Sequence, residues 1–305
     1  MKKILIALIV VVLSVIILFK INSTNKNKDF LNTGVLGYQG TTEQEFQNGF
    51  DEFRNFVLSS QQENISEDTF IKSFAQERRK FIFYDSLMAL MMDLKAGKID
   101  EMILPASVGE YLLSKNALYK NSFSTELLTS NVCFGFREED KELKGDFDRV
   151  IKEMDADGTL DKFEDEYIKT SGDHEPQPTR PLEINNAEEL KIVVTGDLPP
   201  IDMFAGDGKP TGYNTAVLAE IGKRLNKNIK FVNTDSGGRS AALFSGRADV
   251  VFWYRAAQSN IEGKDPLENI FVDAPKGIIL SVPYYSWWNE IVIRMNNQQG
   301  LLGLF

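Results

Sequence analysis

A short pattern that occurs once in each half of the chain restricts its fold most. Residues 94–100 precede the apolar run 102–104, and residues 243–249 precede the apolar run 250–253. In both places a helical pattern ends at a glycine, which can take the left-handed conformation that closes a helix. A short turn then leads into a continuous apolar run of the kind that forms buried parallel strands. The repetition predicts two related α/β lobes.

Each half also opens with a strand pattern that leads into a helix. In the first half, residues 34–38 lead to a helix start at Gly40, Thr41 and Thr42. Thr42 and Glu45 have the spacing of a capping box, and we expect free backbone amides at this helix start. The alternation of strands and helices favours mostly parallel sheets. Further strands are predicted over 80–84, 191–195 and 229–232, and helices over 43–54 and 214–225.

A polar, proline-rich stretch separates the two halves. Residues 170–181 contain three prolines, so we expect an extended linker there. His174 lies within it, and we interpret this side chain as a solvated linker residue. The predicted organisation is an N-terminal segment 1–30, an α/β lobe 31–130, helices over 131–170, a linker 171–189 and an α/β lobe 190–305.

The N-terminus has the pattern of an export signal. Lys2 and Lys3 precede an apolar run over residues 4–19 that only Ser14 interrupts. Such a helix spans about 24 Å, long for the core of a signal peptide and slightly short for a full membrane span. No Ala-x-Ala cleavage site and no lipid-accepting cysteine follows, which favours an uncleaved apolar anchor helix over a secreted mature protein. We expect an extracytoplasmic protein, anchored to the cell membrane or secreted.

Charge and composition exclude several classes of function. Lys and Arg total 34 against 44 for Asp and Glu, a net charge of −10. Because an acidic surface repels phosphate backbones, no nucleic-acid partner is expected. With one cysteine, Cys133, and one histidine, the chain can form neither a disulfide within itself nor a Cys-based zinc site, and a His-based catalytic centre has little to draw on. No cofactor is predicted.

Two ordered sets of short motifs run along the chain. In the second half they are 190–194, 198–200, 208–213, 243–249 and 280–285; in the first half they are 40–42, 84–86, 94–100, 142–143 and 154–160. The set in the second half resembles the first lobe of the family 3 extracellular solute-binding proteins, the amino-acid-binding periplasmic type. The set in the first half resembles that family's second lobe and closing helices. The resemblance implies a periplasmic-binding-protein-like type II fold, in which a hinge joins two α/β lobes.

The order of the two sets differs from the order in that family. Here the second lobe and the closing helices come first, then the linker, then the first lobe. A circular permutation is the favoured interpretation, because domain termini often lie close together at the surface and a linker can join them. The alternative is that the chain holds adjacent halves of two tandem copies.

Ligands of open α/β sheets bind beyond the carboxyl ends of the strands, and four such ends are recognisable. We expect Arg255 to grip an anion and the amides of Thr41 and Thr42 to assist it. Trp253 and Tyr254 offer flat faces for stacking or for a cation. In the alternative interpretation Trp253 packs in the sheet, Arg255 points to water and Arg239 only begins a helix. The candidate ligand-binding residues are Gly40, Thr41, Thr42, Pro105, Ser107, Asp197, Arg239, Trp253, Tyr254 and Arg255.

Two departures from the family pattern bear on the solute. The spacing that places an arginine on the ligand carboxylate is missing, because Arg255 comes too early. The position of the aspartate that pairs with the ligand ammonium is taken by Pro105. An unpaired buried ammonium costs several kcal/mol. These departures argue against an ordinary α-amino acid and leave another small polar or aromatic solute.

Residues 153–164 fit the oxygen-ligand spacing of an EF-hand loop, with Gly158 at its sixth position. The first ligand position is Glu153 rather than aspartate, and no second hand is present. We therefore favour a helix–turn–helix without calcium, with a weak calcium site over 155–164 as the alternative.

These observations together predict a binding module that is not an enzyme. We expect two lobes to close over a small polar solute about hinge strands near 131–135 and 290–294, for recognition by an ABC-transporter permease or a membrane sensor. One alternative is a degenerate, ligand-free sensor or interaction module, motivated by the missing contacts. The other is a dehydratase-type enzyme on the same fold, with Asp197 or Asp202 as acid or base.

Overall fold

The structure is a computed structural model that describes residues 29–36, 42–59, 69–125, 128–171, 179–259, 274–287 and 290–296. The predicted N-terminal export segment with its apolar helix lies outside these residues. Within the described ranges, no helix has both the length and the apolar character needed to cross a membrane.

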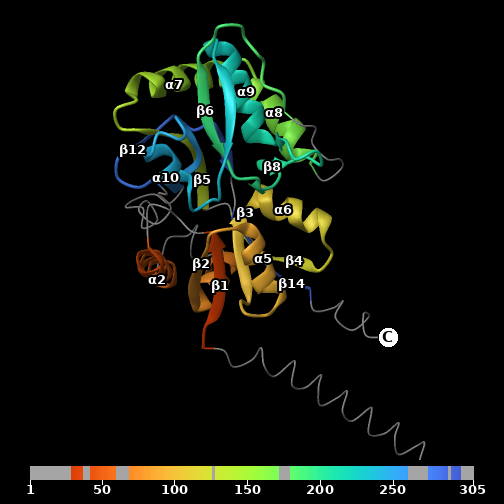
Figure 1. The fold of residues 1–305 in the computed structure, drawn as a ribbon. Helices are drawn as coiled ribbons and strands as arrows, with labels where there is room; N and C mark the ends of the chain where they lie inside the picture. The colour runs from red at the N-terminus through yellow and green to blue at the C-terminus, as the bar shows by residue number, and fades with distance from the viewer. Residues whose placement is uncertain are drawn as a thin grey trace, which may run out of the picture.

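The first of two lobes, the β1 lobe, is built on a five-stranded sheet with the order β2-β1-β3-β14-β4 (Figure 1). Strands β1, β2 and β3 run parallel, whereas β14 runs antiparallel to both of its neighbours. The strands are β1 (Leu31–Leu36), β2 (Arg79–Tyr84), β3 (Glu101–Pro105), β4 (Tyr119–Thr125) and β14 (Glu290–Met295).

Helices cover both faces of this sheet because successive side chains of a strand point to opposite faces. In β14, Val292 joins the apolar cluster under α2 (Glu43–Ser59) and α4 (Thr69–Gln76). Ile291 and Ile293 join the cluster under α5 (Leu87–Lys95) and α6 (Ala106–Lys115). The β1 lobe is therefore a three-layer α/β unit.

The second lobe, the β6 lobe, spans residues 128–287. A parallel pair, β6 and β10, meets the start of β11 through a bridge between Ile192 and Val250, and β11, β12 and β13 all pair antiparallel with β5. Its elements are β5 (Leu128–Arg137), α7 (Lys141–Ala156), α8 (Thr159–Glu164), η1 (Asp165–Lys169), β6 (Glu189–Val194), β7 (Asp197–Leu198), β8 (Asp202–Phe204), β9 (Pro210–Thr211), α9 (Tyr213–Leu225), β10 (Asn228–Asn233), α10 (Arg239–Phe244), β11 (Val251–Ser259), β12 (Ile278–Leu280) and β13 (Tyr285–Trp287).

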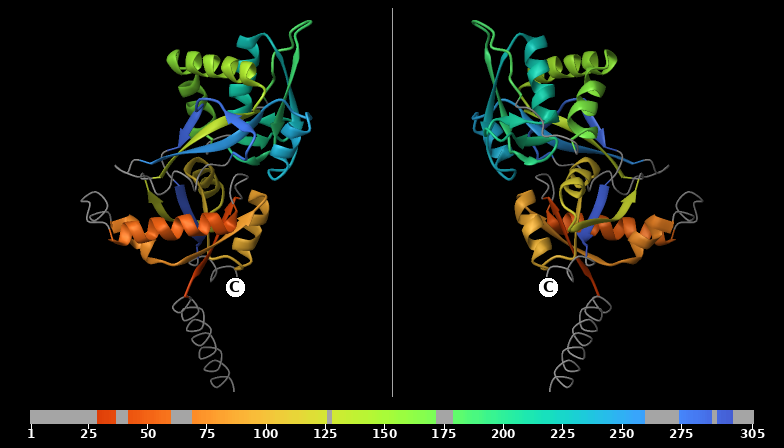
Figure 2. Two further views of the ribbon diagram at one scale, coloured as in Figure 1. Left: turned by 90° about the vertical axis from the view of Figure 1, so that its left-hand side faces the viewer. Right: turned by 90° about the vertical axis from the view of Figure 1, so that its right-hand side faces the viewer.

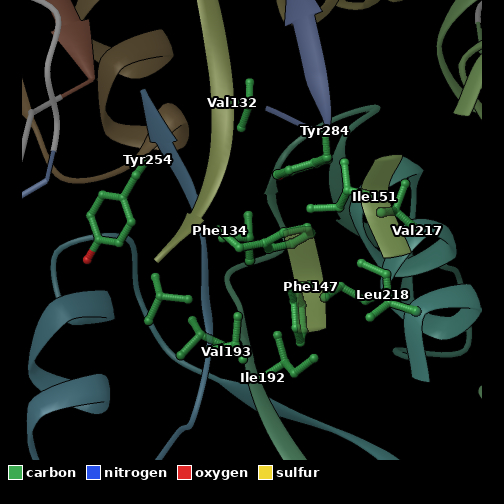
Figure 3. Packing of buried hydrophobic residues seen from close by; sticks show 14 of the residues in the cluster. Val132, Phe134, Phe147, Ile151, Ile192, Val193, Val217, Leu218, Tyr254 and Tyr284 are labelled. Atoms are coloured by element: carbon green, nitrogen blue, oxygen red, sulfur yellow. The ribbon is translucent and has the colours of Figure 1, made fainter. Parts of the chain in front are cut away.

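The β6 lobe has one apolar core, to which the segments before and after the linker both contribute (Figure 3). Phe134 on β5 and Phe147 on α7, both before the linker, pack with Ile192 on β6 and Val217 on α9, which follow it. The ring of Phe134 also stacks on Tyr284 at a centroid distance of 4.0 Å. The helices of 131–170 thus belong to the core of the lobe that follows them.

The two connections between the lobes lie beside the expected hinge strands. The chain passes from β4 to β5 and returns from β13 to β14 (Figure 2). Strands β5 and β14, which contain 131–135 and 290–294, each begin directly after one of these connections. The lobe boundary differs from the prediction, because β14 is an inner strand of the β1 lobe, whereas 190–305 was expected to form the other lobe. The physical reason in β14 is burial, since the side chains of Ile291, Val292 and Ile293 are only 2%, 2% and 0% exposed. The C-terminal strand therefore belongs with the β1 lobe, not with 190–287.

Most predicted elements are confirmed. The glycines that end the repeated pattern, Gly97 and Gly246, follow α5 and α10 with φ of 71° and 69°. Strands at 80–84, 191–194 and 229–232 and the helix 214–225 are present. The sheets are less parallel than expected, because β5, β11, β12 and β13 form an antiparallel sheet.

Candidate functional site

The carboxyl ends of strands from the two lobes face each other. A Cβ atom placed on Gly237, after β10, would lie 3.6 Å from Oδ1 of Asp85, after β2. Helix α5 of the β1 lobe contacts β7 of the β6 lobe. Leu36, at the end of β1, packs against apolar clusters of both lobes. We call this region the interlobe junction, and it is the place where an open α/β sheet binds ligands.

Ser107 and Tyr285 add a second contact between the lobes. Pro105 ends β3 opposite Glu290, and Ser107 lies in the first turn of α6 with 6% exposure. Burial raises the pKa of the Tyr285 hydroxyl and the neighbouring Ser107 side chain opposes this rise, while Ser107 Oγ itself has no hydrogen-bond partner among the described residues. Tyr285 also packs on Tyr213 with a centroid distance of 5.1 Å. The predicted residues Pro105 and Ser107 therefore lie at the interlobe junction.

Asp197 lies on the loop that follows β6. Its Oδ1 accepts hydrogen bonds from the hydroxyls of Thr195 at 2.6 Å and Ser236 at 3.0 Å, and its Oδ2 lies 2.9 Å from Ser236 Oγ. The half-buried carboxylate thus bridges the ends of β6 and β10, next to α5. Sequence reasoning identified Asp197, but not the two hydroxyls that orient it.

Asp202 lies behind this loop, on β8. Its Oδ2 accepts from the backbone amides of Thr195 at 2.8 Å and Gly196 at 2.7 Å, and from the Thr195 hydroxyl at 2.8 Å. Its Oδ1 is buried and has no hydrogen-bond partner among the described residues. Burial raises the pKa of the Asp202 carboxyl to about 6, against the lowering effect of these hydrogen bonds.

The Arg239 guanidinium donates hydrogen bonds to backbone carbonyls of the protein, although it was a candidate for ligand binding. The residue is 4% exposed; its Nε donates to the Ser236 carbonyl at 3.0 Å and its Nη1 to the Phe252 carbonyl at 3.1 Å. Its guanidinium also lies 5.6 Å from the centre of the Tyr254 ring. These contacts support the interpretation in which Arg239 begins α10 and fixes the loop before it.

Tyr254 is fully buried beside α10, where its hydroxyl pairs with Ser240 Oγ at 2.7 Å (Figure 3). It does not end a strand, because β11 continues to Ser259 along β5, so the expected strand end at Trp253, Tyr254 and Arg255 is wrong. The apolar run does stop near Tyr254, but antiparallel pairing continues through the more polar residues that follow. The side chains of Trp253 and Arg255 lie outside the described part of the chain.

The predicted capping box at the start of α2 is present, with a consequence for anion binding. The Thr42 amide donates to Glu45 Oε2 at 2.8 Å, and the Glu45 amide donates to Thr42 Oγ1 at 3.2 Å. The expectation of a free amide at Thr42 is therefore wrong, because the box itself uses it. Gly40 and Thr41 lie outside the described residues.

The sequence reasoning missed four residues at the interlobe junction: Asp85, Thr195, Ser236 and Gly237. Asp85 follows the end of β2, just as Asp197, which was recognised, follows the end of β6. That local signal could have identified Asp85. The pairing of Asp197 with Ser236 could not be read locally, because 39 residues separate them.

Residues 153–164 form a tight turn between two helices. Glu153 and Asp155 lie in the last turn of α7, Gly158 has a φ of 77°, and α8 begins at Thr159. Asp157 Oδ1 accepts from the Thr159 hydroxyl and amide, and Oδ2 pairs with Arg224 at 2.8 Å. In the described segments, no group of three or more His, Cys, Asp or Glu is arranged to hold a metal ion.

Comparison with known proteins gives a family match for the β6 lobe. Residues 190–255 match the family described as bacterial extracellular solute-binding proteins, family 3. The match confirms the resemblance over this stretch, which carries Asp197, Asp202, Gly237 and Arg239. Over this stretch the chain is similar to that family.

Similar solved structures include the ligand-binding component of an ABC-type import system from Staphylococcus aureus with zinc bound. It is 10% identical, with 91% of this chain and 68% of that chain covered and a TM-score of 0.39. The VFT2 domain of the BvgS periplasmic region from Bordetella pertussis is 11% identical, with 90% and 84% covered and a TM-score of 0.38. The aliphatic sulphonate binding protein SsuA from Escherichia coli is 6% identical, with 91% and 68% covered and a TM-score of 0.35. All three TM-scores are below 0.5, and we draw no functional conclusion from them.

Proposed function

We propose that this protein is an extracytoplasmic, non-enzymatic solute-binding protein whose two lobes close over a small polar solute at the interlobe junction. The observation that carries the proposal is the approach of Asp85 and Gly237 from opposite lobes, at the carboxyl ends of their sheets. The family match of the β6 lobe supports it.

The described side chains favour a particular kind of solute. Asp85 and Asp197 present carboxylates at the junction, while the Arg239 guanidinium is engaged by two backbone carbonyls. Carboxylates bind ammonium groups and other hydrogen-bond donors. We therefore propose a solute with a cationic or strongly donating group.

The wider setting of the protein is also a proposal. We propose that an ABC-transporter permease or a membrane sensor recognises the closed form, and that the apolar run 4–19 exports the protein and holds it at the membrane. We also propose a circular permutation, which the position of the family match at residues 190–255, after the β1 lobe rather than before it, supports.

A thermal-shift screen of the full chain against amino acids, short peptides, organic acids and polyamines tests the binding function. A solute at one hundred times its Kd stabilises a protein by about 2.7 kcal/mol, which raises Tm by several degrees. We expect this shift for at least one solute and its loss in Asp197→Asn. The matched control, Asp207→Asn, changes an exposed turn and should keep the shift. No stabilisation by any solute would contradict the proposal and favour a ligand-free module.

A further inference from the structure

Two carboxylates in the β6 lobe contact the same hydroxyl group. Thr195 Oγ1 lies 2.6 Å from Asp197 Oδ1 and 2.8 Å from Asp202 Oδ2. A threonine hydroxyl has one hydrogen, so it can donate to only one of these oxygens at a time. With both carboxylates ionised, the other contact would bring two acceptors together without a proton between them. One added proton satisfies both contacts.

The surroundings of Asp202 favour uptake of that proton. Asp202 is fully buried, and within the described part of the chain its Oδ1 has no hydrogen-bond partner. An ionised carboxylate with a bare, buried oxygen is costly, and a neutral carboxyl removes much of that cost. Burial, opposed by hydrogen bonds from Gly196 and Thr195, raises the pKa of the Asp202 carboxyl to about 6.

The elements packed around Asp202 supply little positive charge that could compensate an ionised Asp202 carboxylate. Asp197 on β7 is the charged side chain that acts on Asp202, and it raises the pKa further. Strand β9 brings Thr211 alongside β8, and α9 begins there with Tyr213 and Asn214, none of them charged at neutral pH. The next loop brings Ser236 onto Asp197 and leads to Arg239, whose guanidinium binds backbone carbonyls.

The same contacts determine the shape of the loop. Gly196 has a φ of 72°, and a Cβ on it would lie 2.0 Å from the Phe204 ring. Position 196 therefore has no space for a side chain. The loop is fixed there by its backbone, because the Gly196 amide donates a hydrogen bond to Asp202 Oδ2. Because a charged acceptor binds an amide more strongly than a neutral one, protonation of Asp202 weakens this anchor.

We propose that Asp197, Thr195 and Asp202 form a proton-sharing triad, and that the proton it binds sets the conformation of loop 195–197 at the interlobe junction. Asp202 acts as a positioning residue for Asp197. The link to solute affinity rests on the proposed function, whereas the proton binding itself does not.

Carbon-13 NMR of the full chain, labelled at the aspartate carboxyl carbon and free of solute, tests the triad. We expect one aspartate to titrate with a midpoint near pH 6 and to disappear in Asp202→Asn. In Thr195→Val the midpoint should shift, because the hydroxyl that joins the two carboxylates is lost. In Asp207→Asn, the control, the midpoint should not move.

Amide hydrogen exchange gives the loop readout. The protection of the Gly196 amide should fall roughly fivefold as Asp202 is protonated, since a neutral acceptor replaces a charged one. In the wild type alone, the absence of any aspartate titrating between pH 5 and 7 would overturn the proposal, as would a midpoint unchanged by Thr195→Val. Because no solute is used, failure of the triad would leave the binding function standing, and failure of the solute screen would leave the triad standing.

Discussion

A single carboxylate, Glu101, joins four strands of the β1 lobe. It lies on β3, and its Oε1 accepts from Thr33 on β1 at 2.8 Å and from Arg79 on β2 at 2.7 Å. Its Oε2 accepts from Arg294 on β14 at 2.9 and 2.6 Å. Glu101 is 0% exposed and Arg79 is 2% exposed, so both charges need partners within the lobe, which Glu77 and Arg294 complete. The C-terminal strand is thus fixed to the lobe by charge as well as by apolar packing.

We expect Glu101→Gln to destabilise the protein by about 3 kcal/mol, because the buried Arg79 guanidinium then keeps only the more exposed Glu77 as its counter-charge. Urea unfolding followed by circular dichroism measures this loss. Glu188→Gln is the control, since Glu188 forms an exposed pair with Lys227 and its removal should barely move the midpoint. Equal, small shifts in both variants would contradict the role of Glu101.

Asp202 predicts a pH dependence of stability. Its pKa of about 6 in the folded protein exceeds the usual value near 3.9 for an unfolded chain. Between these values the folded state holds more protons, so this stabilising contribution is complete below about pH 4 and is lost as the pH rises through 6. The free energy of unfolding of Asp202→Asn relative to wild type should therefore increase from pH 4 to pH 7. A constant difference over this range would contradict the assignment.

At the scale of elements, α2 closes the outer edge of the β1-lobe sheet. Gln47 of α2 donates to the Arg79 carbonyl at 3.0 Å and accepts from the Phe81 amide at 3.1 Å. One turn earlier, Glu43 accepts from the Phe83 amide at 2.9 Å. Free strand edges invite pairing with other chains, and these side chains occupy the edge of β2.

We expect Gln47→Leu to lower the free energy of unfolding by about 1–2 kcal/mol, because two backbone groups of β2 lose their partner. Gln44→Leu is the matched control, since Gln44 is exposed and its side chain bonds only to Asn48 among the interactions seen here. Urea unfolding compares the two. A loss in Gln44→Leu as large as that in Gln47→Leu would contradict the edge-closing role.

Local chemistry made many elements predictable. Gly97 and Gly246 end helices because glycine adopts positive φ without a steric penalty, and Thr42 with Glu45 caps α2 because their spacing permits two reciprocal bonds. The position of β14 was not predictable in this way. Its apolar pattern fits either lobe, and only pairing with β3 and β4, more than 160 residues earlier, decides between them.

At the scale of the whole molecule, the site residues that follow a local pattern were predictable, whereas the contacts between distant segments were not. The sequence placed Asp197, Pro105 and Ser107 at strand ends, where the structure has them. It could not show that Arg239 binds carbonyls or that Asp202 holds the Asp197 loop, because these contacts join separate elements. The likeness of the two lobes was recognisable, whereas their contacts were not.

Gly237 provides a test of lobe closure. A Cβ atom at this position would lie 3.6 Å from Asp85 of the other lobe and 3.7 Å from Asp235, so the bulky side chain of Gly237→Trp should hold the lobes apart. We expect a larger radius of gyration by X-ray scattering and at least tenfold weaker solute binding. Gly206→Trp is the control, because no atom lies within 4 Å of its added Cβ. Unchanged solute affinity in Gly237→Trp would contradict closure at this point.

The most direct test of the central claim is hydrogen exchange measured by mass spectrometry, with and without a solute found in the thermal-shift screen. If the solute lies between the lobes, amide protection should increase together in residues 85–89 of the β1 lobe and in 195–198 and 234–238 of the β6 lobe. Protection confined to one lobe, or located away from these segments, would contradict a shared site.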